Sequence, residues 1–239
     1  MKKYYIIFFI GFIPLAKLFS EDTPQTLYKN SQYEQALAAY QSMDYKNNPY
    51  LLYNIANCYY KLGSKAEATV YYLKAFKLLP RNKDIRENLL KVTQENEQQL
   101  FSPDIPMFAY KIYYFFSDIE ISVLFELFFT ISILLIIIHT RRKDDKLMGY
   151  ILLSSFLFSL FFLWHLLRKN SILSNPAVTL NETTIYSGPK KTFNTLAVIP
   201  KGKIITILSE DDENYIEVGV PQENIKGWVE KNYIAKVND

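Results

Sequence analysis

Two long apolar segments separated by a cluster of six charged residues constrain the fold of this chain more than any other feature. Residues 119–139 and 147–167 are each about 20 residues long, the length of a helix that crosses a hydrocarbon core of about 30 Å. Both are apolar around nearly the whole circumference of a helix, which is unusual in a soluble protein. The sequence therefore predicts a transmembrane hairpin with the loop 140–146, rather than two buried helices of a soluble core.

The charges of this loop indicate the side of the membrane on which it lies. The loop contains RRKDDK, and its four basic residues are typical of a cytoplasmic loop. Arg168 and Lys169 follow the second segment on the opposite side and reduce the charge contrast. With a cytoplasmic loop, residues 21–118 and residues 170–239 both lie outside the cytoplasm.

The amino terminus has the pattern of an export signal. Two lysines precede the apolar run YYIIFFIGFIPLA at residues 4–16, which is short for a membrane span. The cleavage site is imperfect, since Leu18 or Pro14 stands where a small residue is preferred. Residues 1–20 are therefore either a cleaved signal peptide or an uncleaved anchor. Both alternatives place the following segment outside the cytoplasm.

The composition argues against several functional classes. A net charge of +3 is too small to indicate a nucleic-acid-binding protein. Cys58 is the only cysteine, so no internal disulfide and no thiolate metal site is expected. The only histidines, His139 and His165, lie at the ends of the apolar segments, and no nucleophile–base pair, phosphate loop or paired-carboxylate motif is found. We therefore expect no enzyme activity, no cofactor and no metal.

Residues 49–82 have the periodicity of two amphipathic helices with a turn at Gly63, ended by Pro80. The apolar and small positions that define the pattern are Leu52, Ile55, Ala56, Tyr59, Ala68, Tyr72 and Ala75. The segment resembles a tetratricopeptide repeat, a helical hairpin with a period of about 34 residues. The resemblance implies an α-helical module that binds other proteins.

Partial copies of the repeat flank this segment. Residues 31–40 place Ala36 and Tyr40 where the main copy has Ala68 and Tyr72. Residues 83–96 are predicted to form a capping helix. Its inward-facing positions are Ile85, Leu89 and Val92. Because stacked repeats are stable only against neighbours and about three are needed, we expect this short array to lean on the membrane segment or on a partner.

The resemblance implies a protein-binding groove lined by the first helix of each repeat. The residues that would line it are Tyr53, Asn54, Asn57, Tyr60 and Lys61. Tyrosine favours recognition because it offers a large contact area at a small entropic cost. The alternative is that the asparagines and the lysine only solvate the surface. Cys58 occupies a small-residue position of the same helix, as core or as a redox sensor.

A carboxylate inside the first apolar segment and a group of aromatic residues before it are further candidates for functional positions. Glu126 lies inside the segment, and an intramembrane carboxylate is a candidate for function or for partner binding. The alternative is a protonated or snorkelling side chain. Aromatic residues before the segment suit the interface between water and lipid. They are Phe108, Tyr110, Tyr113, Tyr114, Phe115 and Phe116.

Residues 177–239 alternate apolar and polar residues in short runs separated by turn residues, as in a small all-β domain. The recurring positions are Tyr186 to Pro189, Lys201 and Gly202, Tyr215 to Val218, Gly227 to Val229, and Tyr233 and Ile234. Their order resembles that of bacterial SH3-like domains, which implies a small barrel. Tyr186 and Trp228 are candidates for an aromatic binding surface, with Trp228 closing the barrel core as the alternative.

The expected fold class is an α+β multidomain membrane protein. The predicted parts are a signal peptide or anchor (1–20), a repeat domain (21–98), an interfacial linker (99–118), a transmembrane helix (119–139), a cytoplasmic loop (140–146), a second transmembrane helix (147–167), a linker (168–176) and an SH3-like domain (177–239).

This order of parts resembles the BatE-type proteins of the bacterial aerotolerance (Bat) operon. The resemblance implies a membrane-anchored scaffold whose partners are von Willebrand A-domain membrane proteins and, indirectly, a MoxR-type ATPase. It implies the bacterial inner membrane, with both modules on the extracytoplasmic side. The alternative is an envelope sensor that binds peptidoglycan through the SH3-like domain.

Overall fold

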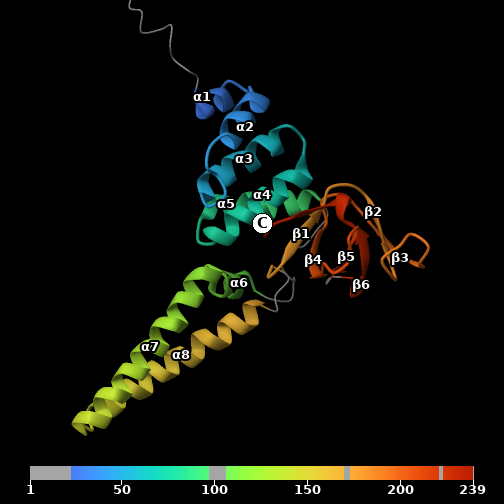
Figure 1. The fold of residues 1–239 in the computed structure, drawn as a ribbon. Helices are drawn as coiled ribbons and strands as arrows, with labels where there is room; N and C mark the ends of the chain where they lie inside the picture. The colour runs from blue at the N-terminus through green and yellow to red at the C-terminus, as the bar shows by residue number, and fades with distance from the viewer. Residues whose placement is uncertain (1–22, 97–105, 170–172, 221–222, 239) are drawn as a thin grey trace, which may run out of the picture.

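The computed structural model of the chain describes residues 23–96, 106–169, 173–220 and 223–238. The predicted signal peptide or anchor, residues 1–20, lies outside the described residues. Figure 1 shows three parts: a stack of short helices, a pair of long antiparallel helices, and a sheet beside the stack. The stack and the sheet lie at the same end of the long hairpin.

The stack consists of five helices. They are α1 (Pro24–Lys29), α2 (Tyr33–Gln41), α3 (Pro49–Lys61), α4 (Lys65–Leu78) and α5 (Lys83–Glu95). Asn48 is the N-cap of α3, because its side chain accepts hydrogen bonds from two backbone N–H groups that have no helical partner. Gly63 has a φ of 78°, which glycine adopts at little cost, and it allows the sharp turn into α4.

The repeat pattern predicted from the sequence is confirmed in the packing. Ala56, Ala68 and Ala75 are fully buried where α3 and α4 cross, since small side chains let two helix backbones approach closely. Ala36 and Tyr40 of the earlier copy are also buried. The capping helix is α5, and its predicted inward-facing residues Ile85, Leu89 and Val92 are all buried.

The two long helices are α7 (Asp118–Arg142) and α8 (Leu147–Lys169), and both are long and apolar enough to cross a membrane. Only 11% and 6% of their most apolar stretches is buried within the protein, unlike the core helices of a soluble domain. Ser132 and Ser154 are buried where the helices meet and share a hydrogen bond of 3.0 Å. The first helix extends to Arg142, so two of the basic residues predicted in the loop belong to its last turn.

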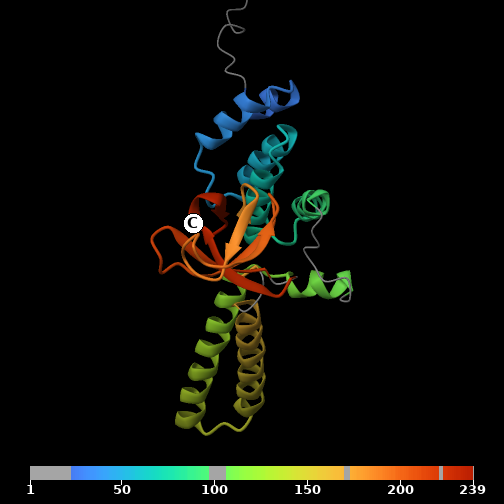
Figure 2. The same ribbon diagram turned by 90° about the vertical axis from the view of Figure 1, so that its right-hand side faces the viewer.

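A short helix, α6 (Met107–Tyr113), precedes this hairpin. In Figure 2 it lies beside the end of the hairpin, crosswise to the two long helices. The turn into α7 is closed by a capping box, in which Ser117 and Glu120 exchange hydrogen bonds between side chain and backbone.

The carboxy-terminal part is one antiparallel sheet of seven strands in the order β3-β2-β6-β5-β4-β1-β7. The strands are β1 (Pro176–Thr179), β2 (Thr183–Tyr186), β3 (Thr195–Ile199), β4 (Ile204–Ser209), β5 (Tyr215–Val220), β6 (Ile225–Glu230) and β7 (Ile234–Lys236), with a 3-10 turn, η2 (Lys231–Tyr233), before the last strand. Its core contains Ile185, Ile205, Ile216, Val218 and Val229.

The expected closed SH3-like barrel is not confirmed, because the sheet is open. Closure requires hydrogen bonding between the first and last strands of the order. Among the described residues, β3 pairs only with β2, and β7 pairs only with β1. The link between β2 and β6 is also short, with the single pair Tyr186 and Trp228.

The repeat stack and the sheet share one apolar core. Phe76 of α4 belongs to the same buried cluster as Val178 of β1 and Val237 after β7. Tyr114, which follows α6, belongs to this cluster as well. The short repeat array therefore leans on the sheet and on the segment that precedes the hairpin.

Candidate protein-binding groove and domain junction

A pocket of about 380 Å³ lies on the repeat stack where the groove is predicted. Four of the five predicted residues line it: Tyr53, Asn57, Tyr60 and Lys61. Asn54 is half-buried but does not line the pocket. The sequence reasoning missed Tyr28, Tyr72, Asn88 and Lys91, which also line it. The lining comes mainly from α1, α3 and α5, the first helices of successive units.

A hydrogen-bond network holds the polar side chains of this groove in place. Asn88 donates from Nδ2 to the hydroxyl of Tyr53 at 2.8 Å and to Oδ1 of Asn57 at 3.3 Å. The hydroxyl of Tyr72 donates to the same oxygen of Asn57 at 2.6 Å. These contacts join α3, α4 and α5. Because the side chains are already ordered, a partner that binds here loses less free energy in ordering them.

The charges of the groove are predominantly positive. The hydroxyl of Tyr60 donates to Glu95 at 2.6 Å and lowers the pKa of this carboxyl, and Lys65 lies 3.1 Å from its other oxygen. Lys91 lies over the ring of Tyr60, 5.1 Å from its centroid. In the described part of the chain, neither Lys61 nor Lys91 forms an ion pair, so both ammonium groups are available to an acidic ligand.

Burial keeps the phenols of the groove neutral. It raises the pKa of Tyr28 to about 12 and also raises the pKa of Tyr72. These side chains therefore act as hydrogen-bond donors and as apolar surfaces at physiological pH. Cys58 lies beneath them with no exposed surface, and burial raises the pKa of its thiol to about 11. Such a thiol is a poor nucleophile, which favours the core interpretation of Cys58 over the redox sensor.

The sheet carries the predicted aromatic surface. Tyr186 and Trp228 are direct cross-strand neighbours, and both are half-buried, whereas Gly227 and Val229 on either side of the tryptophan are buried. Trp228 thus lies on the outer face of the sheet and does not belong to the buried core. Tyr215 extends the surface, with its ring 6.5 Å from that of Tyr186.

Glu126 is exposed on the outside of the hairpin. Its carboxylate forms no hydrogen bond or ion pair within the part of the chain that the structure describes, and only its backbone carbonyl accepts from Thr130. His165, on the other helix of the hairpin, contacts different residues. Its Nδ1 lies 3.3 Å from the hydroxyl of Ser122, and its ring packs against Phe125.

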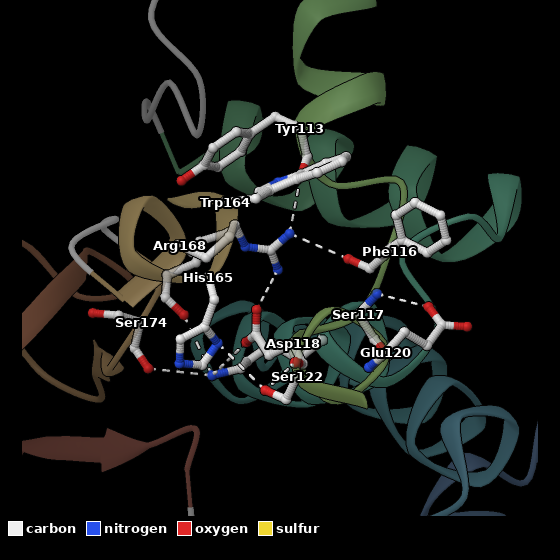
Figure 3. Close-up of polar contacts among 12 residues, drawn as sticks. Tyr113, Phe116, Ser117, Asp118, Glu120, Ser122, Trp164, His165, Arg168 and Ser174 are labelled. Atoms are coloured by element: carbon white, nitrogen blue, oxygen red, sulfur yellow. Dashed lines mark hydrogen bonds and ion pairs between the residues drawn. The ribbon is translucent and has the colours of Figure 1, made fainter. Parts of the chain in front are cut away.

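Polar contacts join the repeat stack, the hairpin and the sheet, and most of them are drawn in Figure 3. Arg168, at the end of α8, is only 7% exposed and forms an ion pair of 2.6 Å with Asp118 of α7. Its guanidinium donates to the backbone carbonyls of Tyr113 at 3.0 Å and Phe116 at 3.2 Å. It also stacks on the ring of Tyr114, 4.4 Å from the centroid.

Lys77 of α4 connects the same junction to the sheet. Its ammonium donates to the carbonyls of Leu173 and Ser174, both at 3.3 Å, and to the side chain of Asn238 at 2.6 Å. Burial lowers the pKa of Lys77, while Asp118, 3.9 Å away, acts in the opposite direction. The lysine therefore links α4, the segment before β1 and the residues after β7 through a single cation.

The aromatic flank predicted for the water–lipid interface divides into two groups. Tyr114 is buried and packs on Phe76 at 5.6 Å, because the repeat stack covers this side of the segment. This residue is thus a core residue, and its placement at the interface was wrong. Phe108 and Phe115 are exposed, as an interfacial position requires.

Comparison with known proteins identifies one family. Residues 49–82 match the model of the tetratricopeptide repeat family, the segment predicted from the sequence. Tetratricopeptide repeats are protein-interaction modules and typically not catalytic. No curated protein matches the chain, and no solved structure does.

Proposed function

We propose that this protein is a membrane-anchored scaffold whose repeat groove binds an acidic segment of a partner protein outside the cytoplasm. The observation that carries the proposal is the ordered groove, with its tyrosines and with Lys61 and Lys91, which form no ion pair with the residues that the structure describes. Tyrosines supply contact area, and the lysines favour a carboxylate-bearing ligand. The resemblance to BatE-type proteins makes von Willebrand A-domain membrane proteins the partner class, with a MoxR-type ATPase acting through them.

The topology proposed from the sequence has the support of the arrangement in Figure 1. The repeat stack and the sheet lie at the same end of the hairpin, and the basic residues around the loop lie at the other end. A cytoplasmic loop in the bacterial inner membrane would place both modules on the extracytoplasmic side. Because the two modules are held beside each other, binding of a complex by one module raises its effective concentration at the other, so two weak interactions add up.

The groove is tested by purifying the full-length protein from native membranes in mild detergent, with lysine crosslinking and mass spectrometry. We expect A-domain proteins to crosslink through Lys61 or Lys91. The double variant Tyr53→Ala/Tyr60→Ala should recover at least about tenfold less partner, since buried tyrosines at interfaces contribute about 1–2 kcal/mol or more each. Tyr50→Ala is the matched control, because Tyr50 lies on the same helix, is 60% exposed and does not line the groove.

The aromatic surface of the sheet supports a second candidate function. Tyr186, Tyr215 and Trp228 offer partly exposed ring faces, which suit an envelope sensor that binds peptidoglycan. In that case the crosslinks would join muropeptides or cell-wall enzymes to Lys190, Lys191 or Lys226. Such a result, with unchanged recovery for the groove variant, would replace the scaffold by the envelope binder.

Glu126 would extend the proposed interaction surface into the membrane. A carboxylate that faces lipid is costly, and a polar residue of a partner helix would satisfy it. We expect Glu126→Leu to reduce the recovery of the A-domain membrane partners in the same purification, while the partner that is still recovered crosslinks through Lys61 or Lys91 as before. Unchanged assembly would remove Glu126 from the interaction surface.

A further inference from the structure

A second pocket, of about 280 Å³, lies between the repeat stack and α6, beside the end of the hairpin. It is lined by Phe76, Pro80, Arg81, Arg86, Tyr110, Lys111, Tyr114 and Phe115. The lining combines three cations with aromatic rings, and it contains no acidic residue among the residues that the structure describes. The groove shares no lining residue with this pocket, and the domain junction shares Phe76 and Tyr114 with its wall.

The three cations differ in their partners. Arg81 is held by Glu120 of α7 at 2.5 Å and lies over the ring of Phe115, 5.3 Å from its centroid. Arg86 and Lys111 form no ion pair or hydrogen bond within the described ranges. The neighbouring Glu87 pairs with Lys83 at 3.8 Å on the outer side of α5. Two cations thus converge on the pocket, and no acidic side chain of the described residues pairs with either of them.

The surroundings of the pocket are apolar and exposed. Phe108 and Ile112 are 65% and 60% exposed and lie four residues apart on one face of α6, and Phe115, which follows the helix, is 48% exposed. In Figure 2, α6 lies beside the end of the hairpin and crosswise to the two long helices, as a helix in the plane of the interface would. If α7 and α8 cross the bilayer, this exposed face reaches the outer boundary of the hydrocarbon, and the cations lie at the depth of the headgroups.

We propose that this pocket binds the phosphate-bearing headgroup of an anionic phospholipid. Arg86 and Lys111 contact the phosphate, while Arg81, fixed by Glu120, positions the pocket wall. The acyl chains lie against Phe108, Ile112 and Phe115. The proposal rests on the membrane placement of the hairpin and is independent of the partner that occupies the groove. A lipid bound here would bridge α5 and α6 and fix the angle between the repeat stack and the membrane.

Native mass spectrometry of the full-length protein, extracted in detergent and supplied with phosphatidylcholine or phosphatidylglycerol, tests the proposal. We expect retention of one phosphatidylglycerol in preference to phosphatidylcholine. The variant Arg86→Gln/Lys111→Gln should bind it about 25-fold more weakly, from a loss of about fivefold for each cation near an anionic lipid. Lys83→Gln is the matched control, because Lys83 lies on the same helix as Arg86, is highly exposed, pairs with Glu87 and does not line the pocket.

Several outcomes would overturn the proposal. Equal retention by the wild type and the double variant would do so, as would equal retention of both lipids. Displacement of the lipid by inorganic phosphate at equal concentration would show a site for a soluble phosphate instead. Two parallel measurements separate this failure from that of the proposed function. If alkaline carbonate extracts the protein from membranes, the membrane placement is wrong and this proposal fails with it. If the double variant loses the lipid but keeps its groove crosslinks, the change is confined to the lipid site.

Discussion

Replacing Arg168 with alanine is expected to loosen the junction between the hairpin and the two modules, with a loss of about 3 kcal/mol of stability there. The substitution removes the ion pair with Asp118 and the donors to the carbonyls of Tyr113 and Phe116. Hydrogen bonds to a charged group contribute about 1.5–3 kcal/mol each, and a buried acceptor without a partner adds a desolvation cost. The Oδ1 atom of Asp118 is buried while Arg168 covers it, but the side chain as a whole is 41% exposed, so water reaches the carboxylate in the variant and the lost donors to the two carbonyls account for most of the expected effect.

Amide hydrogen exchange in detergent measures this effect directly. Faster exchange is expected in residues 113–121 and in the last turn of α8, together with a lower thermal midpoint. Lys169→Ala is the matched control, since Lys169 is the neighbouring basic residue and is exposed. Arg168→Lys should be intermediate, because an ammonium keeps the charge but lacks the planar fork that serves several acceptors. Exchange in Arg168→Ala equal to that of the wild type would show that the junction is held by apolar packing alone.

Gly227→Ala is expected to destabilise the sheet by about 3 kcal/mol, at the upper end of the range for added core volume. A Cβ atom at this position would lie 2.5 Å from the carbonyl oxygen of Tyr186 and 2.6 Å from a methyl group of Ile185. The backbone of β2 cannot give way without breaking the short pairing between β2 and β6. The expected result is separation of the β2–β3 hairpin from the rest of the sheet.

The measurement is thermal unfolding of the full-length variant, with hydrogen exchange to locate the change in β2, β3 and β6. Gly219→Ala on the adjacent strand β5 is the matched control, because its added Cβ would meet Leu208 at an ordinary 3.5 Å. We expect this control to change stability by less than about 1 kcal/mol. Equal stability of the two variants would mean that the β2–β6 contact contributes little to the sheet.

Features that depend on neighbouring residues were predictable from the sequence. The helices of the central repeat begin and end where Pro49, Gly63 and Pro80 indicate, because proline and glycine act on the local backbone. The capping helix and its buried face follow from apolar residues at helical spacing. The length and apolar character of the hairpin helices likewise follow from local composition.

The groove was only partly predictable. The phase of α3 identified four lining residues, but Asn54 lies outside the lining, since one residue along a helix rotates the side chain by about 100°. Tyr28 and Asn88 were missed because their positions depend on how successive helices stack. Asn88 and Lys91 are three residues apart and therefore lie on the same face of the capping helix. This shared face was the signal that could have identified them as lining residues.

The sequence by itself determined where the central repeat and its capping helix form, which segments are long and apolar enough for a membrane, and most of the α3 residues that line the pocket on the repeat stack. Only the tertiary structure decided that the sheet stays open, that Trp228 faces outward and that Tyr114 is buried. It also decided that Arg168, whose charge suggested an exposed flank, lies in a junction of three distant segments. The physical reason is that periodicity and capping act over a few residues, whereas these contacts join residues far apart in the chain. Such contacts form only when the packing of the whole molecule compensates the entropy of bringing the segments together.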